Sequence, residues 1–296
     1  MPRIGFVGAG HIGSNMALRL IDKGYRLCVC DLNDVVRQSF VGKADVTGRC
    51  ADLAESDVVI MMVADDRQLE AALFGQHGLV EGLTETTSPA LIVMSTVIPA
   101  TVRALPERLS GRRMIVVDAP VSGGPASARK GALSIMAGGS AADFEAVRPV
   151  LEDLGEHVFY CGPLGAGAAA KLVNNVLGVC NVYLAAEAYA LAQALGTDLA
   201  KIIPILEAGT GRNFWSKSLE ETVGQYRAFT NPEAGFYSMI DIVTKDLRLI
   251  DSIPERADLA LPMLRGVAEG VQGLHDRGVA EKVFRQWVAI AAANDR

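Results

Sequence analysis

The feature that most constrains the fold is a glycine cluster that lies between an apolar strand pattern and a helical pattern. Ile4 to Val7 form a short apolar run, and Gly8, Gly10 and Gly13 follow it with G-x-G-x-x-G spacing. A helical pattern then runs from Met16 to Gly24. This order of strand, glycine turn and helix predicts a mononucleotide-binding unit, the first part of a doubly wound sheet of Rossmann type.

Each glycine of this fingerprint has a physical role in the expected site. Gly8 allows the tight turn, Gly10 lets the backbone approach a pyrophosphate, and Gly13 lets the helix pack close to the sheet. The pyrophosphate is expected at the helix N-terminus, beside the loop residues His11 and Ile12, where N–H groups and the helix dipole favour negative charge. A glycine turn without a ligand is the alternative, and the flanking strand and helix make it the weaker interpretation.

An acidic residue at the end of the second apolar run predicts the cofactor. Leu27 to Cys30 form that run, and Asp31 follows it. A carboxylate here accepts hydrogen bonds from the adenosine ribose hydroxyls of NAD and repels the 2′-phosphate of NADP. The next residues, Leu32, Asn33 and Asp34, offer no arginine to receive that phosphate. The sequence therefore predicts NAD as the cofactor, in preference to NADP.

Length and charge exclude several classes of protein. The 296 residues are enough for about two domains. The net charge is −6 with no basic tract, which argues against nucleic acid or an anionic membrane as a partner. The five cysteines lack metal-ligand spacing, so no metal site is expected, and they indicate a reducing compartment. With a strand already at residue 3 and no apolar run that approaches the length of a membrane span, the sequence predicts a cytoplasmic protein.

Strand and helix patterns alternate through the first half of the chain. Further strands are expected at 58–63, 90–94, 114–117, 133–137 and 158–160, and helices at 35–41, 66–74, 99–109 and 143–154. This alternation predicts an α/β fold with a parallel sheet, whose ligand lies beyond the carboxyl ends of the strands. Val63, Ala64 and Thr96 fall at such ends and are expected to contact the cofactor.

The character of the sequence changes after Pro163. Residues 166–195 contain no proline and a single central glycine, and they are rich in alanine, leucine and valine. This is typical of a long helix that neighbours bury on several sides. Further helices are expected at 201–208, 213–225, 232–252, 260–276 and 278–293. The predicted organisation is a dinucleotide-binding domain over 1–163 and an all-helical domain over 164–296.

A turn after one of the strands could bind a carboxylate. Ser122, Gly123 and Gly124 offer a hydroxyl and consecutive backbone N–H groups that nothing bulky shields. A carboxylate accepts several such hydrogen bonds at once. An ordinary strand-to-helix turn is the alternative, since turn glycines are common.

Two lysines are candidates for chemistry. Lys171 and Asn175 are one helical turn apart, and Lys171 is a cation within a long apolar helix. Burial there should lower its pKa, which suits proton exchange with an alcohol. The alternative is a lysine that extends to the surface from a helix end. Lys245 is a weaker candidate for the cofactor site, because a Lys245–Asp246 pair usually marks a solvated helix face.

Four motifs in order give the chain a family resemblance. They are GFVGAGHIGSNMA at 5–17, DAPVSGGPASARKGALSIMAGG at 118–139, GAGAAAKLVNN at 165–175 and KDL at 245–247. Together they resemble the β-hydroxyacid dehydrogenase family, which includes 3-hydroxyisobutyrate dehydrogenases, tartronate semialdehyde reductases and L-threonate dehydrogenases. The resemblance covers essentially the whole chain.

The resemblance implies an activity and a set of roles. It implies reversible NAD-dependent oxidation of a small β-hydroxyacid of 3-hydroxyisobutyrate, glycerate or threonate type, in a homodimer or homotetramer formed mainly through the helices. The implied roles are catalytic for Lys171, substrate-positioning for Asn175, carboxylate-binding for Ser122, Gly123 and Gly124, and nicotinamide contact for Thr96 and Lys245. Asn213, Phe214, Trp215 and Phe236 are expected to shape the pocket.

Two other functions stay open on the sequence. One is a non-catalytic NAD-binding scaffold or redox sensor, for which a cation in an apolar helix has no evident use. The other is an imine reductase-like enzyme. Members of that related family usually lack a lysine at this position, so Lys171 favours an alcohol substrate.

Overall fold

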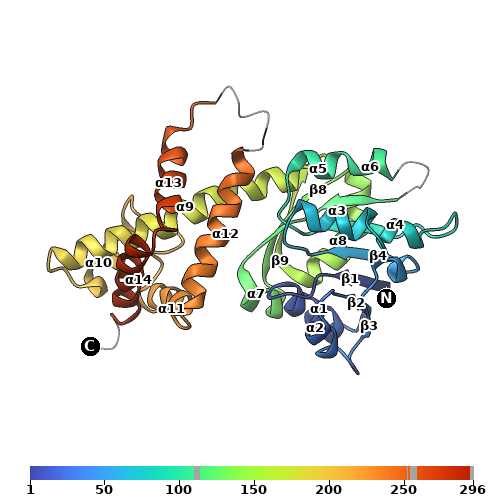
Figure 1. The fold of residues 1–296 in the computed structure, drawn as a ribbon, viewed down its shortest axis with the longest axis horizontal. Helices are drawn as coiled ribbons and strands as arrows, with labels where there is room; N and C mark the ends of the chain where they lie inside the picture. Colours follow the sequence, from blue (N-terminus) through green and yellow to red (C-terminus); the bar gives the residue numbers. More distant parts are fainter. Residues whose placement is uncertain (110–113, 252, 254–258, 294–296) are drawn as a thin grey trace. The chain divides into compact units, whose positions relative to one another are not determined.

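The computed structural model describes residues 1–109, 114–251, 253 and 259–293 (Figure 1). The chain divides into two compact units, Met1–Lys171 and Leu172–Arg296. The division falls inside the long helix α9 (Ala166–Ala194), a few residues beyond the predicted boundary near 163. Each unit has its own hydrophobic core.

A twisted sheet with helices on both faces forms the first unit. Its described strands are β1 (Arg3–Val7), β2 (Arg26–Cys30), β3 (Asp45–Thr47), β4 (Val58–Met61), β5 (Ala90–Val93), β6 (Val116–Asp118), β7 (Val121–Ser122), β8 (Leu133–Gly138) and β9 (Gly155–Gly162). They follow the order β3-β2-β1-β4-β5-β6-β8-β7, with β9 paired to β8. Strands β2 and β3 lie on one side of β1, and β4 to β6 lie on the other side. The order of the strands thus reverses between β1 and β4, and a ligand is expected beyond the carboxyl ends of these two strands.

The first six strands are parallel, which confirms the predicted parallel-dominated α/β fold. The structure differs from the prediction beyond β6, because β8 runs antiparallel to β6 and β7 while β9 is parallel to β8. The physical reason is the short connection 123–132, which holds one small helix. A parallel return needs a longer crossover connection.

Alternating side chains of the strands supply the two faces of the sheet. Ile4 and Phe6 of β1 pack with the helices α1 (Gly13–Asp22), α7 (Gly124–Lys130) and α8 (Ala141–Leu154). Val7 belongs to the cluster on the other face. That cluster includes residues from η1 (Cys50–Leu53), α3 (Asp66–Phe74), α4 (Leu79–Gly82), α5 (Pro99–Arg103) and α6 (Leu105–Arg108). The short helix α2 (Asp34–Gln38) buries none of its residues.

The second unit is helical throughout the part that the structure describes. After α9 come α10 (Leu199–Ala208), α11 (Leu219–Thr230), α12 (Ala234–Asp251), α13 (Pro262–Gly273) and α14 (Arg277–Ala291) (Figure 1). An aromatic group is central to their core: the ring of Trp287 lies 5.0 Å from Tyr226 and 5.2 Å from Phe236, centroid to centroid. The Tyr226 hydroxyl donates to the Val182 carbonyl of α9 at 2.8 Å, so the buried polar group is satisfied.

Caps and prolines explain where observed helices differ from those expected. The helix predicted over 213–225 begins at Leu219, because the Ser218 side chain caps it by accepting from the Glu221 N–H. The helix predicted over 99–109 is divided into α5 and α6 at Ala104, two residues before Pro106, which lacks an N–H. Residue 252, the predicted end of the helix over 232–252, lies outside the described residues.

Helix α9 is long and apolar enough to cross a membrane by length and composition, contrary to the expectation that no run approaches that length. Its residues Val182, Ala186 and Tyr189 are buried in the core of the second unit. A core helix surrounded by neighbours has the same composition as a membrane span.

Candidate functional site

The fingerprint glycines differ in what surrounds them. Gly8 has φ +87°, and a Cβ there would lie 2.4 Å from the Met62 carbonyl oxygen, so a side chain is excluded. A Cβ on Gly13 would lie 2.0 Å from the Gly8 carbonyl oxygen. A Cβ on Gly10 would meet nothing within 4 Å. Gly8 and Gly13 therefore close the turn onto the helix, while Gly10 leaves open space where a ligand could approach the backbone.

The start of α1 suits an anion. The residue before it, Ile12, provides no side-chain hydrogen bond to the first turn, and that turn contains no acidic residue. Ile12 packs its side chain against the core, whereas His11 is exposed and its carbonyl accepts from the Asn15 amide at 2.8 Å. Backbone N–H groups at a helix start bind phosphate well, so these residues fit a dinucleotide pyrophosphate.

Asp31 lies at the end of β2 with its carboxylate against the glycine loop. Its Oδ2 accepts from the Ala9 N–H and its Oδ1 from the Asn33 N–H, both at 2.8 Å. These two bonds fix the side chain beside the turn. The carboxylate has further acceptor capacity for ribose hydroxyls.

An arginine is close to Asp31, which corrects the expectation that none is at hand. Arg37 Nη1 donates to the carbonyl oxygens of Asp31 at 2.6 Å and Leu32 at 2.9 Å, and Nη2 pairs with Asp34 at 3.0 Å. The guanidinium thus stabilises the turn after β2. The helix pattern that follows Asp34 explains the proximity, because Arg37 is one turn into α2.

Two further predicted cofactor residues follow β4. The Val63 N–H donates to the Ser95 hydroxyl at 2.8 Å, and the Ala64 N–H donates to Gln68 Oε1 at 3.0 Å. Ser95 also donates to the Met61 carbonyl at 3.2 Å, so it ties the end of β4 to the end of β5. Thr96 follows directly and is half-buried at the same edge of the sheet.

The predicted carboxylate-binding turn depends on glycine geometry. Gly123 has φ +134° and Gly124 has φ +74°, both in the region that favours glycine. A Cβ on Gly123 would lie 2.9 Å from the Ser127 Cβ, whereas Gly124 faces open space. Ser122 ends β7 and is half-buried. At this turn Gly123 is exposed and Gly124 is half-buried.

A buried carboxylate holds the start of α9. Asp118 is fully buried at the end of β6, and its two oxygens accept from the Gly165 N–H at 2.7 Å and the Ala168 N–H at 2.6 Å. Burial raises the pKa of Asp118, while these backbone hydrogen bonds oppose the increase. Lys171 lies just beyond this anchored turn and is only 7% exposed. The burial that the sequence interpretation required is therefore present.

Asn175 belongs to a polar group within the second unit. Its Nδ2 donates to Asp246 Oδ2 at 2.7 Å, and Lys245 Nζ lies 3.2 Å from Asp246 Oδ1. Asp246 is only 6% exposed, so its carboxylate does not lie on the solvated face that the sequence suggested, whereas the Lys245 side chain is 38% exposed. The carboxylate fixes the orientation of the amide.

Sequence reasoning gave no role to Asp118 and Asp246, although both carried a signal. Asp118 ends an apolar strand, and Asp246 lies within the largely apolar run of α12. A carboxylate within a buried element needs partners, and this would have identified both.

The four residues that were expected to shape the pocket lie in different surroundings. Trp215 and Phe236 belong to the core of the second unit, and Phe214 is exposed. Asn213 is engaged locally, where its Oδ1 accepts from the Trp215 N–H at 2.8 Å.

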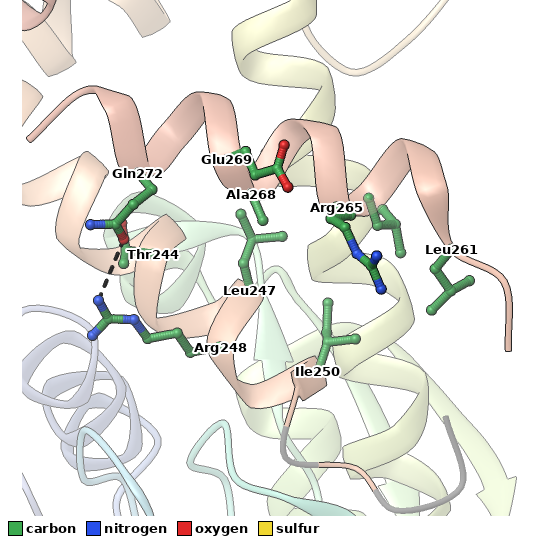
Figure 2. A pocket seen from close by; sticks show the side chains of 10 residues that line it. Thr244, Leu247, Arg248, Ile250, Leu261, Arg265, Ala268, Glu269 and Gln272 are labelled. Carbon is green, nitrogen blue, oxygen red and sulfur yellow. Dashed lines mark hydrogen bonds between the residues drawn. The ribbon is translucent and has the colours of Figure 1, made fainter. Parts of the chain in front are cut away.

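Hollows lie along α12 in the part of the chain that the structure describes. One of about 430 Å³ lies between α12 and α13, and Figure 2 shows Leu247, Ile250 and Leu261 along it, with Arg248 directed at Gln272 at 3.5 Å. None of the predicted site residues lines it. A second, of about 320 Å³, is lined partly by Lys245.

Family models cover most of the chain. Residues 3–162 match the NAD binding domain of 6-phosphogluconate dehydrogenase, and residues 165–290 match the NAD-binding domain of NADP-dependent 3-hydroxyisobutyrate dehydrogenase. The fold, the glycine loop and these matches define an NAD(P)-binding oxidoreductase.

Relatives agree over nearly the full length. A 3-hydroxyisobutyrate dehydrogenase of Pseudomonas aeruginosa is 34% identical over 95% of this chain and 94% of its own. The mitochondrial 3-hydroxyisobutyrate dehydrogenase of Drosophila melanogaster is 32% identical over 95% and 86%. An NAD-dependent L-serine dehydrogenase of Pseudomonas aeruginosa is 31% identical over 96% of each chain.

Among solved structures, 3-hydroxyisobutyrate dehydrogenase of Mycobacterium tuberculosis with L-serine has a TM-score of 0.77 at 24% identity, covering 93% of this chain and 94% of its own. This likeness shows the shared fold. From the family models and full-length relatives, the chain belongs to the β-hydroxyacid dehydrogenase family.

Proposed function

We propose that the protein catalyses the reversible NAD-dependent oxidation of a small β-hydroxyacid to its semialdehyde or keto acid. The buried lysine carries the proposal, because Lys171 is 7% exposed on a helix whose start Asp118 anchors. A relative acts on 3-hydroxyisobutyrate and another on L-serine. Both compounds carry a hydroxyl on the carbon next to the one that bears the carboxylate.

The proposed binding roles divide the substrate into two ends. The backbone N–H groups of Gly123 and Gly124, with the Ser122 hydroxyl, bind the carboxylate. Asn175 and Lys171 hold the hydroxyl, and the Asp246 carboxylate keeps the Asn175 amide oriented. The cofactor supplies the hydride acceptor when it is bound. Lys245 and Thr96 are proposed to contact the nicotinamide end of that cofactor.

Lys171 is proposed to move the proton. It accepts the hydroxyl proton during oxidation and returns it during reduction. A positioned acid or base of this kind contributes about 10²–10⁴-fold to the rate. Orientation of the hydroxyl by Asn175 should increase the rate further, because a reacting group that is already in place loses less entropy on the way to the transition state.

Lys171→Ala tests this proposal. We expect kcat for an accepted hydroxyacid to fall by at least about 100-fold, with NADH affinity changed by less than about threefold. The assay follows NADH at 340 nm with a panel of short hydroxyacids, and NADH binding is titrated separately. The matched control is Lys201→Ala, which removes an exposed lysine of α10.

The same panel separates the alternatives. Unchanged turnover in Lys171→Ala would remove this lysine from the mechanism. NADH binding without turnover of any hydroxyacid would favour a non-catalytic scaffold. Reduction of cyclic imines instead of semialdehydes would favour an imine reductase. One such enzyme, from Myxococcus stipitatus, shares the fold with a TM-score of 0.60 at 17% identity, over 97% of this chain and 99% of its own.

We also propose that NAD is preferred to NADP. Asp31 carries the negative charge that disfavours a 2′-phosphate, and Arg37 is engaged with two carbonyl oxygens and Asp34. Initial rates with the two cofactors in the same panel decide this, since better use of NADP would contradict the role of Asp31.

We infer that the protein acts in the cytoplasm as a homodimer or homotetramer. An apolar stripe on α9 supports self-association, because large side chains are exposed along its length. These are Val173, Leu177, Leu184, Leu191 and Leu195. Their spacing of four and seven residues places them on one face of the helix.

A further inference from the structure

Two thiols lie in contact beside the cofactor loop. The Sγ atoms of Cys30 and Cys50 are 3.5 Å apart. Cys30 is the last residue of β2 and only 2% exposed, whereas Cys50 begins η1 and is half-buried. They are separated in sequence by β3, so the fold itself brings them together.

The two thiols are chemically unequal. The hydrogen bond between them raises the pKa of the Cys30 thiol, which keeps its proton. The same bond lowers the pKa of the Cys50 thiol, against the opposing effects of burial and of Asp52. Because the thiolate is the nucleophile, Cys50 is the sulfur that reacts first, and it is also the more accessible of the two.

We propose that Cys30 and Cys50 form a redox-reactive pair that hydrogen peroxide oxidises to a disulfide. The Cys50 thiolate attacks one peroxide oxygen, an S–O bond forms and the O–O bond breaks, and hydroxide leaves and takes up a proton as water. The Cys30 sulfur, losing its proton, then attacks the Cys50 sulfenic acid. An S–S bond forms, the S–O bond breaks, and a second water leaves.

Because the pair lies next to the expected cofactor site, its oxidation should affect cofactor binding. This consequence rests on the proposed function. The Cys30 carbonyl accepts from the Gly8 N–H at 2.9 Å, and the next residue is Asp31, whose N–H donates to the Thr47 carbonyl at 3.2 Å. Closing the disulfide shortens the Sγ–Sγ distance from 3.5 Å to about 2.05 Å and joins β2 to η1 by a cross-link of fixed geometry. Oxidation should therefore disturb both the fingerprint turn and the ribose carboxylate.

The first experiment maps the oxidised thiols. The reduced protein is treated with hydrogen peroxide, the remaining thiols are alkylated, and peptides are identified by mass spectrometry without reduction. We expect a Cys30–Cys50 cross-linked peptide that dithiothreitol removes. The cross-link should persist in Cys161→Ser, which removes an exposed thiol, and disappear in Cys30→Ser and Cys50→Ser. Absence of the cross-link in the wild-type protein overturns the proposal, whatever the variants do.

The second experiment measures NADH binding by its fluorescence before and after oxidation. We expect affinity to fall about tenfold in the wild-type protein, to return with dithiothreitol and to stay unchanged in peroxide-treated Cys50→Ser. A cross-link without a change in affinity overturns the coupling to the cofactor site. Failure of the reduced protein to bind NADH contradicts the proposed function instead, and the peptide map still decides the thiol pair.

Discussion

At the scale of the residue, the most informative side chain is a carboxylate that the sequence suggested was solvated. Asp246 is buried, yet it accepts from the Asn175 amide at 2.7 Å and lies 3.2 Å from Lys245 Nζ. Burying a carboxylate is unfavourable unless partners compensate for lost water. The Asn175 amide and the Lys245 ammonium supply that compensation.

Asp246→Asn should separate this positioning role from folding. An amide is neutral, so the ion pair with Lys245 is lost, and so is the charge-assisted hydrogen bond from Asn175, which contributes about 1.5–3 kcal/mol. We expect kcat to fall about tenfold or more, with a smaller change in NADH affinity. Steady-state kinetics and fluorescence titration measure the two effects.

The control for this variant is Glu220→Gln, an exposed carboxylate of α11. Equal losses of kcat in Asp246→Asn and the control would contradict the positioning role. So would a loss explained fully by a lower fraction of folded protein, which thermal unfolding of both variants monitors.

At the scale of the element, α9 shows how one strand end can place a helix. Asp118 accepts from the Gly165 N–H just before the helix and from the Ala168 N–H of its first turn, where the helix dipole also favours a negative charge. Glycines make this close approach possible, since a Cβ on Gly167 would lie 2.1 Å from the Met136 carbonyl oxygen. The first turn of α9 is thus fixed against β6 and β8, and this fixes the backbone of Lys171.

A second inter-element contact gives a pH-dependent stability. Tyr25, which precedes β2, donates from its hydroxyl to Asp153 Oδ2 of α8 at 2.8 Å. Burial, helped by this bond, raises the pKa of Tyr25 to about 12. The folded pKa lies above the unfolded value of about 10, so the folded state keeps a proton that the unfolded chain releases.

The contribution of Tyr25 is therefore present below pH 10 and lost as the pH rises toward 12. At about 1.4 kcal/mol per pKa unit it amounts to roughly 2–3 kcal/mol. We expect Tyr25→Phe to show a shallower decline of unfolding free energy between pH 10 and 12 than the wild-type protein. Urea unfolding across this range measures it, with Tyr237→Phe as a partly exposed control. Parallel declines in wild type and Tyr25→Phe would contradict the assignment.

At the scale of the whole molecule, the sequence predicted the parallel part of the sheet and the helical second half. Both depend on local periodicity, which Ile4–Val7 and the long apolar run of α9 display clearly. The reversal at β8 was missed, because periodicity carries no strand direction. The three-residue strand β3 was also missed, since it is too short to show a pattern.

Candidate site residues were predictable where a motif carried them, and their partners were not. The glycine spacing gave Gly8, Gly10 and Gly13 without reference to tertiary structure. The contact of Asp246 with Asn175 depends instead on which helices meet in space, and spacing along the chain does not specify it. Arg37 differs, because it lies one helical turn after Asp34 and its spacing could have identified it.

Self-association is the prediction that belongs to the whole molecule. Leu184 lies exposed at the middle of the apolar stripe on α9. A charge at that place in a buried interface would be unfavourable, so Leu184→Arg should shift the protein toward monomer. Sedimentation velocity over a range of concentrations measures the shift, with Lys201→Ala as the control. A wild-type protein that is monomeric at every concentration would contradict the inferred oligomer.

The three fingerprint glycines have different surroundings, so a mutation at each of them should have a different effect on folding and on ligand binding. At Gly8 and Gly13 an added methyl group collides with the backbone, so replacement disrupts the turn whether or not a ligand is present. At Gly10 the methyl group would meet no protein atom within 4 Å. Gly10→Ala should therefore leave the chain correctly folded. Its methyl group would, however, lie where the pyrophosphate is expected to approach the backbone.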